Sequence, residues 1–135
     1  MRTVLKFLGT AVLAAAATPA TAADADHGKT LYVACAACHS EKPDALGPSL
    51  RGVLGRKSGA LEDFRYSNPM KRANLVWDEA NLRAYILDPQ AKVKGNRMPF
   101  GGLREPKDAD DIVAYLRSEE HTSELQSQST ISYAV

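Results

Sequence analysis

A pentapeptide in the first third of the chain, Cys35-Ala36-Ala37-Cys38-His39, places two thiols and an imidazole close together. On a helix, Cys35 and Cys38 share a face, and His39 follows Cys35 by one turn. Thiols in this spacing bond to the vinyl groups of haem while the next histidine ligates iron, so the pattern predicts covalent haem attachment. The alternatives are a thioredoxin-like redox pair, half of a zinc site, and a disulfide.

The rest of the chain offers these alternatives little support. It contains no further cysteine, and its other histidines are His27 and His121. Zinc would need more ligands than the pentapeptide supplies. A thioredoxin-like pair is usually set in an alternating α/β pattern, and no such pattern is visible. Haem attachment is therefore the favoured interpretation.

The first 22 residues have the pattern of a secretory signal peptide. Arg2 and Lys6 precede an uncharged apolar stretch at 7–17, and small residues follow it. The pattern predicts cleavage near Ala22/Ala23 and a location in the periplasm. Export fits the haem interpretation, because c-type haem is attached outside the cytoplasmic membrane. The apolar stretch is short for a membrane span, and an uncleaved anchor is the alternative.

Residues 118–135 are predicted to be foreign to the natural protein. The segments 117–127 and 131–135 look like the translation of a common short-read sequencing adapter, and 128–130 fall where its variable index would lie. A natural polar tail is the alternative. We therefore expect the functional domain to comprise residues 23–117.

This domain is small and weakly charged. Residues 23–117 carry fifteen basic and thirteen acidic side chains, a formal charge of about +2 before haem is counted. The surplus is too small to indicate nucleic acid or a lipid surface as a partner. A domain of this length is close to the lower limit for a self-sufficient core, so a buried haem would supply apolar surface as well as chemistry.

Helical patterns occupy three main segments, and neither a β pattern nor a repeat is visible. The first helix, capped by Asp26, leads into the cysteine motif, and its Gly28 is expected at a close contact with the last helix. The second helix runs from Asp78 to about Leu87, and the last opens near Pro106. These segments predict an all-α domain.

Long loops rich in glycine and proline separate the helices. They occupy residues 40–59 and 95–102, and a short helical turn is expected at 69–73. Loops of this length are uncommon in a compact domain unless they wrap something. We expect them to wrap the haem.

Further motifs accompany the pentapeptide along the whole domain. They are Gly47-Pro48-Ser49-Leu50-x-Gly52-Val53-x-Gly55-Arg56, Phe64-x-Tyr66, Trp77, Tyr85, Gly95-Asn96-x-Met98-Pro99-Phe100 and Asp111-Ile112-Val113-Ala114-Tyr115-Leu116. In combination they resemble those of class I c-type cytochromes, close to the bacterial relatives of mitochondrial cytochrome c. The resemblance implies the small cytochrome c fold, with three main helices, short turns and long loops around one covalent haem c.

The resemblance also implies how the haem is held. Cys35 and Cys38 would form thioethers with it. His39 would be the proximal iron ligand, its second ring N–H donating to the carbonyl of Pro48. Met98 would be the distal ligand, since a thioether sulfur favours ferrous iron and raises the reduction potential.

Other residues are implied to surround the haem. Arg56, Tyr66, Trp77 and Asn96 resemble the family's partners of the haem carboxylates, Tyr85 would lie near the Met98 sulfur, and Phe100 would guard the haem face. Met70 is the rival distal ligand. It stands where the mitochondrial family usually has asparagine, a departure that puts the polar network beside the haem in doubt.

The function implied is that of a single-electron carrier and not of an enzyme. It would be a monomer that serves a cytochrome bc-type complex and a terminal oxidase or reaction centre, through an exposed haem edge and a weak contact. The basic residues that could steer acidic partners are Lys42, Lys92, Lys94 and Arg97. One alternative is a haem enzyme such as a peroxidase, which needs an acid/base residue, but no histidine lies near Met98 in sequence. Another is a sensing or electron-entry module of a larger protein.

Overall fold

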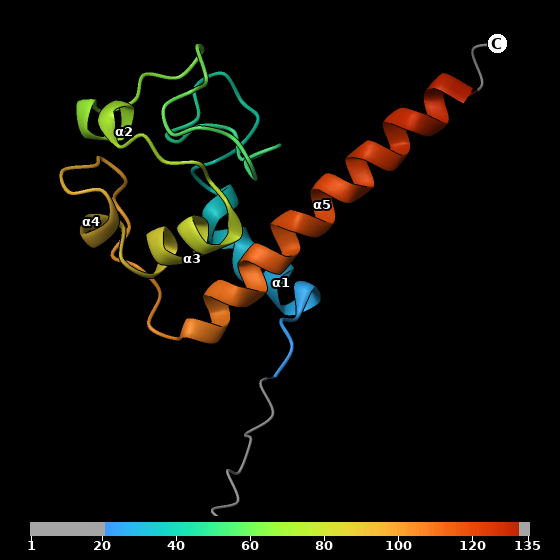
Figure 1. Cartoon of the computed structure of the whole chain (residues 1–135), viewed down its shortest axis with the longest axis horizontal. Coiled ribbons are helices and arrows are strands. Elements are labelled where there is room, and N and C mark those ends of the chain that lie inside the picture. The colour runs from blue at the N-terminus through green and yellow to red at the C-terminus, as the bar shows by residue number, and fades with distance from the viewer. Residues whose placement is uncertain (1–20, 133–135) are drawn as a thin grey trace, which may run out of the picture.

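The computed structural model describes residues 21–132, with the side chains at 124, 125 and 127–132 excepted. Its helices are α1 (Ala25–Ala36), α2 (Asn68–Arg72), α3 (Glu79–Leu87), α4 (Pro89–Lys92) and α5 (Pro106–Ser132), joined by long loops (Figure 1). The described residues form no strand, only an isolated antiparallel bridge between Lys57 and Val76. The all-α prediction is confirmed.

The described residues leave out both ends of the chain. Residues 1–20, most of the predicted signal peptide, lie outside the described part of the chain, as do residues 133–135. No helix among the described residues is both long and apolar enough to cross a membrane.

Side-chain caps define most helix starts, as the sequence suggests, but the first cap differs from the prediction. Asp24, not Asp26, caps α1: its backbone is extended and its carboxylate accepts the N–H groups of Asp26 and His27. Asp78 caps α3 as predicted. Asp26 cannot serve as the cap because it already lies inside the helix, where a residue has helical φ/ψ.

The end of α3 has one feature that was not anticipated. Asp88 and Pro89 end this helix, as predicted, but Pro89 also begins the short helix α4, and the Asp88 side chain accepts the N–H of Ala91. Proline suits a first helical position, because its missing N–H would have no helical partner there.

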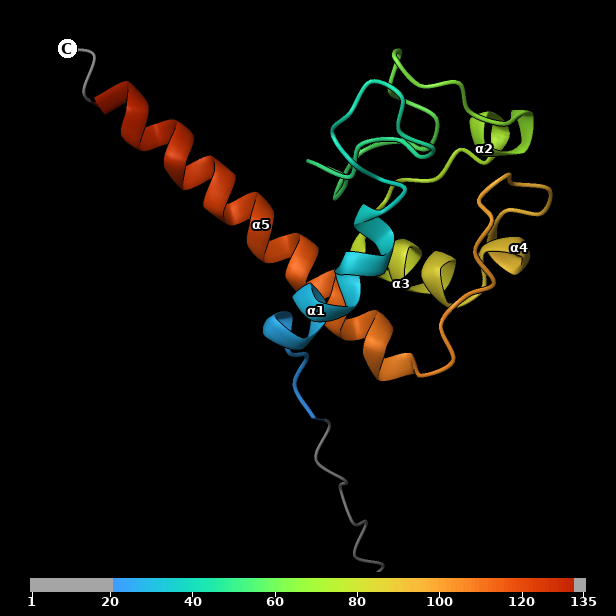
Figure 2. The same cartoon turned by 180° about the vertical axis from the view of Figure 1, so that it is seen from behind.

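The first and last helices cross in close contact, which Figures 1 and 2 show from both sides. At Gly28 a β-carbon would lie 1.9 Å from the carbonyl oxygen of Asp111, so only glycine allows the two backbones to approach this closely. The rings of Tyr32 and Tyr115 meet beside this point, with centroids 5.2 Å apart. The predicted contact between these helices is confirmed.

The carboxylate of Asp111 anchors the start of α1 to α5. It is fully buried, and it accepts the N–H of Asp24 at 2.7 Å, the Nδ1–H of His27 at 2.8 Å and the ammonium of Lys107 at 2.8 Å. These hydrogen bonds hold the pKa of Asp111 well below its ordinary value. The charged form of this carboxyl therefore stabilises the helix crossing.

We expect Asp111→Asn to lower the free energy of unfolding by about 1–3 kcal/mol near neutral pH, because the buried acceptor of these three hydrogen bonds loses its charge. Since the folded-state pKa of Asp111 is depressed, its stabilisation is present above the unfolded value of about 3.9 and is lost as the pH falls towards the folded value. Urea denaturation of wild type and variant at neutral and at acidic pH measures this difference.

Asp108→Asn is the matched control for this experiment. Asp108 lies in the first turn of α5, one turn before Asp111, but its carboxylate accepts no side-chain hydrogen bond within the described residues. We expect little change in its stability at either pH. An Asp111→Asn loss that is equally large in acid would contradict the assigned role of the charge.

Helix α5 continues beyond the predicted end of the domain. The helix runs past Arg117 to Ser132, through the segment expected to be foreign. No glycine or proline interrupts residues 107–132, so no local signal stops the helix. The side chain of Glu120 accepts the backbone N–H of Leu54 at 2.9 Å. The origin of residues 118–135 stays a prediction.

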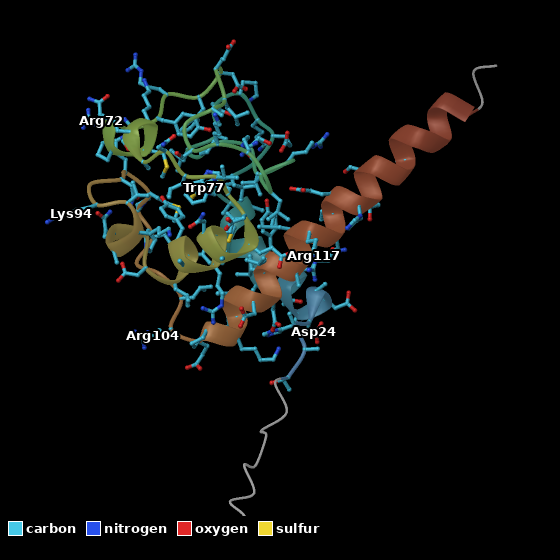
Figure 3. All side chains as sticks on the ribbon, viewed as in Figure 1. Asp24, Arg72, Trp77, Lys94, Arg104 and Arg117 are labelled. Atoms are coloured by element: carbon cyan, nitrogen blue, oxygen red, sulfur yellow. The ribbon has the colours of Figure 1, made fainter. Side chains whose placement is uncertain are left out.

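Two loop segments, residues 55–58 and 75–77, pair through backbone hydrogen bonds. They lie beneath the lobe that the long loop between α1 and α2 forms. Gly55 donates its N–H to the carbonyl of Trp77, Trp77 donates to Arg56, and Ser58 donates to Leu75. Figure 3 shows Trp77 in the middle of the molecule, below this lobe. The pairing holds Arg56 and Trp77 side by side, although the two residues are far apart in the sequence.

The core is built mainly from α3, α5 and single residues of the loops. Its buried apolar cluster comprises Val53, Trp77, Leu82, Tyr85, Val93, Ile112, Val113 and Leu116. Both predicted methionines, Met70 and Met98, are partly buried against this cluster. The core therefore joins the helix crossing to the loops that carry the candidate site.

Candidate functional site

The cysteine motif lies at the C-terminal end of α1, which ends at Ala36. The N–H groups of Cys38 and His39 both donate to the carbonyl of Cys35, at 3.1 and 2.9 Å, so the chain continues to turn after the helix. Both thiols are free and partly buried. Burial raises the pKa of the Cys35 thiol. Both thiols are thus available for covalent attachment.

The imidazole of His39 is held in one orientation by the loop that follows. Its Nδ1–H donates to the carbonyl of Pro48 at 2.8 Å, the hydrogen bond that the sequence resemblance implies. Its Nε2 has no hydrogen-bond partner among residues 21–132. A histidine with one nitrogen fixed by a carbonyl and the other free has the arrangement of a metal ligand with its supporting hydrogen bond.

Gly47 completes this support, a role that the sequence alone did not indicate. Its N–H donates to the carbonyl of Cys38 at 2.9 Å. A β-carbon at Gly47 would lie 2.5 Å from Cε1 and 2.6 Å from Nδ1 of His39. The backbone of Gly47 therefore packs directly on the imidazole. The Gly47-Pro48 dipeptide, a turn signal in the loop that follows His39, could have indicated this contact.

The two methionines occupy different kinds of structure. Met98 lies in the non-helical loop after α4, whereas Met70 lies within α2. Both pack against the core cluster, so burial does not distinguish them. The backbone N–H of Met98 donates to Oδ1 of Asn96 at 2.9 Å. The loop that carries Met98 is therefore held in place by a side chain two residues earlier.

Trp77 and Tyr85 form a buried aromatic pair. Their ring centroids are 5.0 Å apart, and the two residues are 8% and 7% exposed. Burial raises the pKa of Tyr85 to about 12, which keeps its hydroxyl protonated at physiological pH. The indole N–H and the phenolic O–H are both hydrogen-bond donors. Both can donate to another group.

Arg56 and Tyr66 come near each other in the loop lobe. The Arg56 guanidinium donates to the carbonyls of Ser49 and Arg51, at 2.6 and 3.0 Å. Burial raises the pKa of Tyr66, while a hydrogen bond to the backbone of Leu61 and the positive charge of Arg56 oppose that rise. Tyr66 also packs edge-on against Phe64, with ring centroids 4.9 Å apart. The lobe thus brings a cation and a phenol together.

The remaining predicted residues have distinct environments. Asn96 is buried, and its amide is fully engaged with neighbouring residues of the chain. Phe100 is 38% exposed, which is unusual for a phenylalanine. Among the basic residues, Lys94 projects outward from the edge of the molecule (Figure 3), whereas Arg97 donates to the carbonyl of Arg65.

A cavity of about 400 Å³ lies elsewhere, between the N-terminal segment, α3 and α5. Its charged lining is already paired, Arg83 with Asp110 at 2.5 Å and Arg117 with Glu79 at 2.9 Å. It contains none of the predicted site residues. This cavity is therefore separate from the cysteine motif.

The donor set at the end of α1 fits a haem better than zinc or a redox pair. In the described residues, the one group of three potential metal-binding side chains is His27, Asp108 and Asp111, and it includes neither cysteine. The absence of strands among them argues against a thioredoxin-like setting. Two free thiols and an imidazole with one nitrogen available match what a covalent haem requires.

Comparisons with known proteins agree with this chemistry. The family described as cytochrome c matches residues 25–120. The chain is 41% identical over 112 residues to cytochrome c2 of Blastochloris viridis, covering 81% of this chain and 88% of that protein. It is 48% identical over 98 residues to cytochrome c2 of Rhodoblastus acidophilus, covering 70% and 92%. The structure of cytochrome cH from Methylobacterium extorquens superposes with a TM-score of 0.67 at 40% identity, covering 70% of this chain and 98% of that one.

Proposed function

The chain belongs to the cytochrome c family, and from this we propose that it is a periplasmic single-electron carrier with His39 and Met98 as its iron ligands. Proteins of this family carry one covalent haem c and transfer electrons without acting as enzymes. The bound haem supplies the Fe(III)/Fe(II) couple. The chain supplies attachment, orientation and the surroundings that set the potential.

The support of His39 is the observation that carries this proposal. The Pro48 carbonyl holds Nδ1, and the backbone of Gly47 lies against the ring. This arrangement leaves Nε2 as the nitrogen for iron. We propose that Cys35 and Cys38 form the thioethers, which would keep the haem beside this imidazole.

Met98 is the proposed distal ligand. Met98 lies in a non-helical loop, and its backbone N–H donates to the side chain of Asn96. This hydrogen bond fixes the backbone at a point where a sulfur ligand needs a defined position. A thioether favours ferrous iron and raises the potential, as a carrier requires. Permanent ligation on both sides also minimises rearrangement when the electron arrives or leaves.

Polar and aromatic side chains are proposed to complete the haem pocket. Haem carboxylates are costly to bury without donors, and Arg56, Tyr66 and Trp77 can supply them. The protonated hydroxyl of Tyr85 is proposed to lie near the Met98 sulfur. Phe100, which is partly exposed, is proposed to cover the haem face.

Location and partners follow from the sequence pattern and the family. We propose that residues 1–22 direct export to the periplasm and are removed near Ala22/Ala23. The proposed partners are a cytochrome bc-type complex and a terminal oxidase or reaction centre, reached by a monomer through a small, transient contact. Exposed basic side chains such as Lys42 and Lys94 would steer acidic partners.

Optical spectra of the exported protein test this function. We expect a low-spin spectrum in both oxidation states, a sulfur-to-iron charge-transfer band in the ferric state, and no reaction of the ferrous protein with carbon monoxide. A chain without residues 2–22 is the control, and we expect it to carry no covalent haem. High-spin iron that readily binds carbon monoxide would contradict a six-coordinate carrier.

A further inference from the structure

Asn96 lies between α4 and the proposed distal ligand, and its side chain is engaged at both ends. Its amide nitrogen donates to the carbonyls of Pro89 and Val93, each at 2.9 Å. Its Oδ1 accepts the N–H of Met98 at 2.9 Å. The residue is 8% exposed. An amide group has two hydrogens to donate, and both are used within the chain, so neither remains for a haem carboxylate.

The turn that carries Asn96 is closed by further contacts from the same helix. The N–H of Asn96 donates to the carbonyl of Val93 at 3.1 Å. Gln90 donates to the carbonyl of Asn96 at 3.1 Å and accepts the N–H of Gly95 at 3.0 Å. Gly95 has a φ of +82°, which lets the chain reverse here without strain. The backbone before Met98 is therefore tied to α4, and Asn96 extends that tie to Met98 itself.

We propose that Asn96 is a positioning residue for the distal ligand, which keeps the Met98 loop closed by joining it to α4. This inference rests on the proposed ligation by Met98. Without the Asn96 side chain, the N–H of Met98 loses its acceptor. The carbonyls of Pro89 and Val93 each lose one hydrogen bond and keep a backbone one, so the closed loop is weakened relative to an open loop. The specific consequence is easier displacement of Met98 by an added ligand, beyond any loss of stability.

Titration of the ferric holoprotein with imidazole tests the proposal. Loss of the sulfur-to-iron charge-transfer band measures how much imidazole has bound. Asn81→Ala is the matched control, because the Asn81 amide also ties backbone by donating to Val76 at 2.9 Å, but near the N-terminal end of α3. We expect Asn96→Ala to bind imidazole at least about 10-fold more tightly than wild type, a change of about 1.4 kcal/mol, and Asn81→Ala to stay within about twofold. Equal affinities for the two variants would overturn the proposal.

Two further variants keep the test decisive if Asn96→Ala does not mature. In Asn96→Ser the hydroxyl can accept the N–H of Met98 but cannot reach both carbonyls, so we expect an affinity between those of wild type and Asn96→Ala. Asn96→Asp keeps the acceptor but turns carboxylate oxygens towards Pro89 and Val93, so we expect binding at least as tight as in Asn96→Ala. Wild-type affinity in both would overturn the positioning role.

Met98→Ala, measured in parallel, separates this inference from the function on which it rests. If Met98→Ala retains the charge-transfer band, distal ligation by Met98 is wrong and the positioning role is wrong with it. If Met98→Ala loses the band while the Asn96 variants bind imidazole like wild type, the ligand assignment holds and only the positioning role is wrong.

Discussion

We expect Gly47→Ala to displace the imidazole of His39 and to lower the free energy of unfolding by about 1–3 kcal/mol, the usual cost of overpacking. The added methyl group would lie 2.5 Å from Cε1, 2.6 Å from Nδ1 and 3.0 Å from Nε2 of the ring. The ring cannot turn away without losing its hydrogen bond to Pro48. Both the stability and the iron ligation should therefore suffer.

Thermal unfolding and the ferric spectrum of the holoprotein measure this effect. We expect a lower midpoint and a partial change from low-spin to high-spin iron in Gly47→Ala. Gly101→Ala is the matched control, because a β-carbon at Gly101 meets no atom within 4 Å in the described structure and its φ is not positive. A Gly47→Ala protein with the spectrum and midpoint of wild type would show that the ring is free to move.

Met98→Ala should open the distal side of the iron. We expect loss of the charge-transfer band, rapid binding of carbon monoxide and a reduction potential lower by on the order of 0.2 V, within the roughly 0.8 V range over which axial ligands tune haem. The physical reason is the loss of a soft sulfur ligand that favours ferrous iron. Spectroscopy and potentiometric titration measure these changes.

Met70→Ala is the control that distinguishes ligation from packing. Met70 and Met98 are both partly buried against the same core cluster, so both variants lose apolar contacts at a cost of about 2–5 kcal/mol. We expect Met70→Ala to lose stability but to keep the charge-transfer band and its inertness to carbon monoxide. The opposite pattern would make Met70 the distal ligand.

The local elements were predictable from local signals. Asp78 with the apolar residues after it indicates α3, and Pro106 marks the start of α5, because caps and proline act on the few residues beside them. The Cys35–His39 spacing, together with the histidine count of the chain, was sufficient to predict haem attachment. The family comparison agrees with that prediction.

The partners that two polar side chains take in the fold were not indicated by the sequence. The first helix cap is Asp24 instead of Asp26, and the N–H of Asp24 also donates to Asp111, which is 87 positions away. Asn96 donates its two amide hydrogens to the nearby carbonyls of Pro89 and Val93, and its predicted place beside a haem carboxylate stays a prediction. A polar side chain takes whichever partner the fold brings within about 3 Å, and sequence spacing carries no such information.

The division between local and long-range information is clearest at His39. The motif alone predicts that this histidine is an iron ligand, because covalent attachment at Cys35 and Cys38 would place haem next to it. The nitrogen that is left available to a metal depends on how the loop returns, since the Pro48 carbonyl engages Nδ1 and Gly47 packs on the ring. The chemistry predicted for the five-residue motif follows from its residue types. The orientation of the His39 imidazole follows from packing between segments that meet only after the chain has folded.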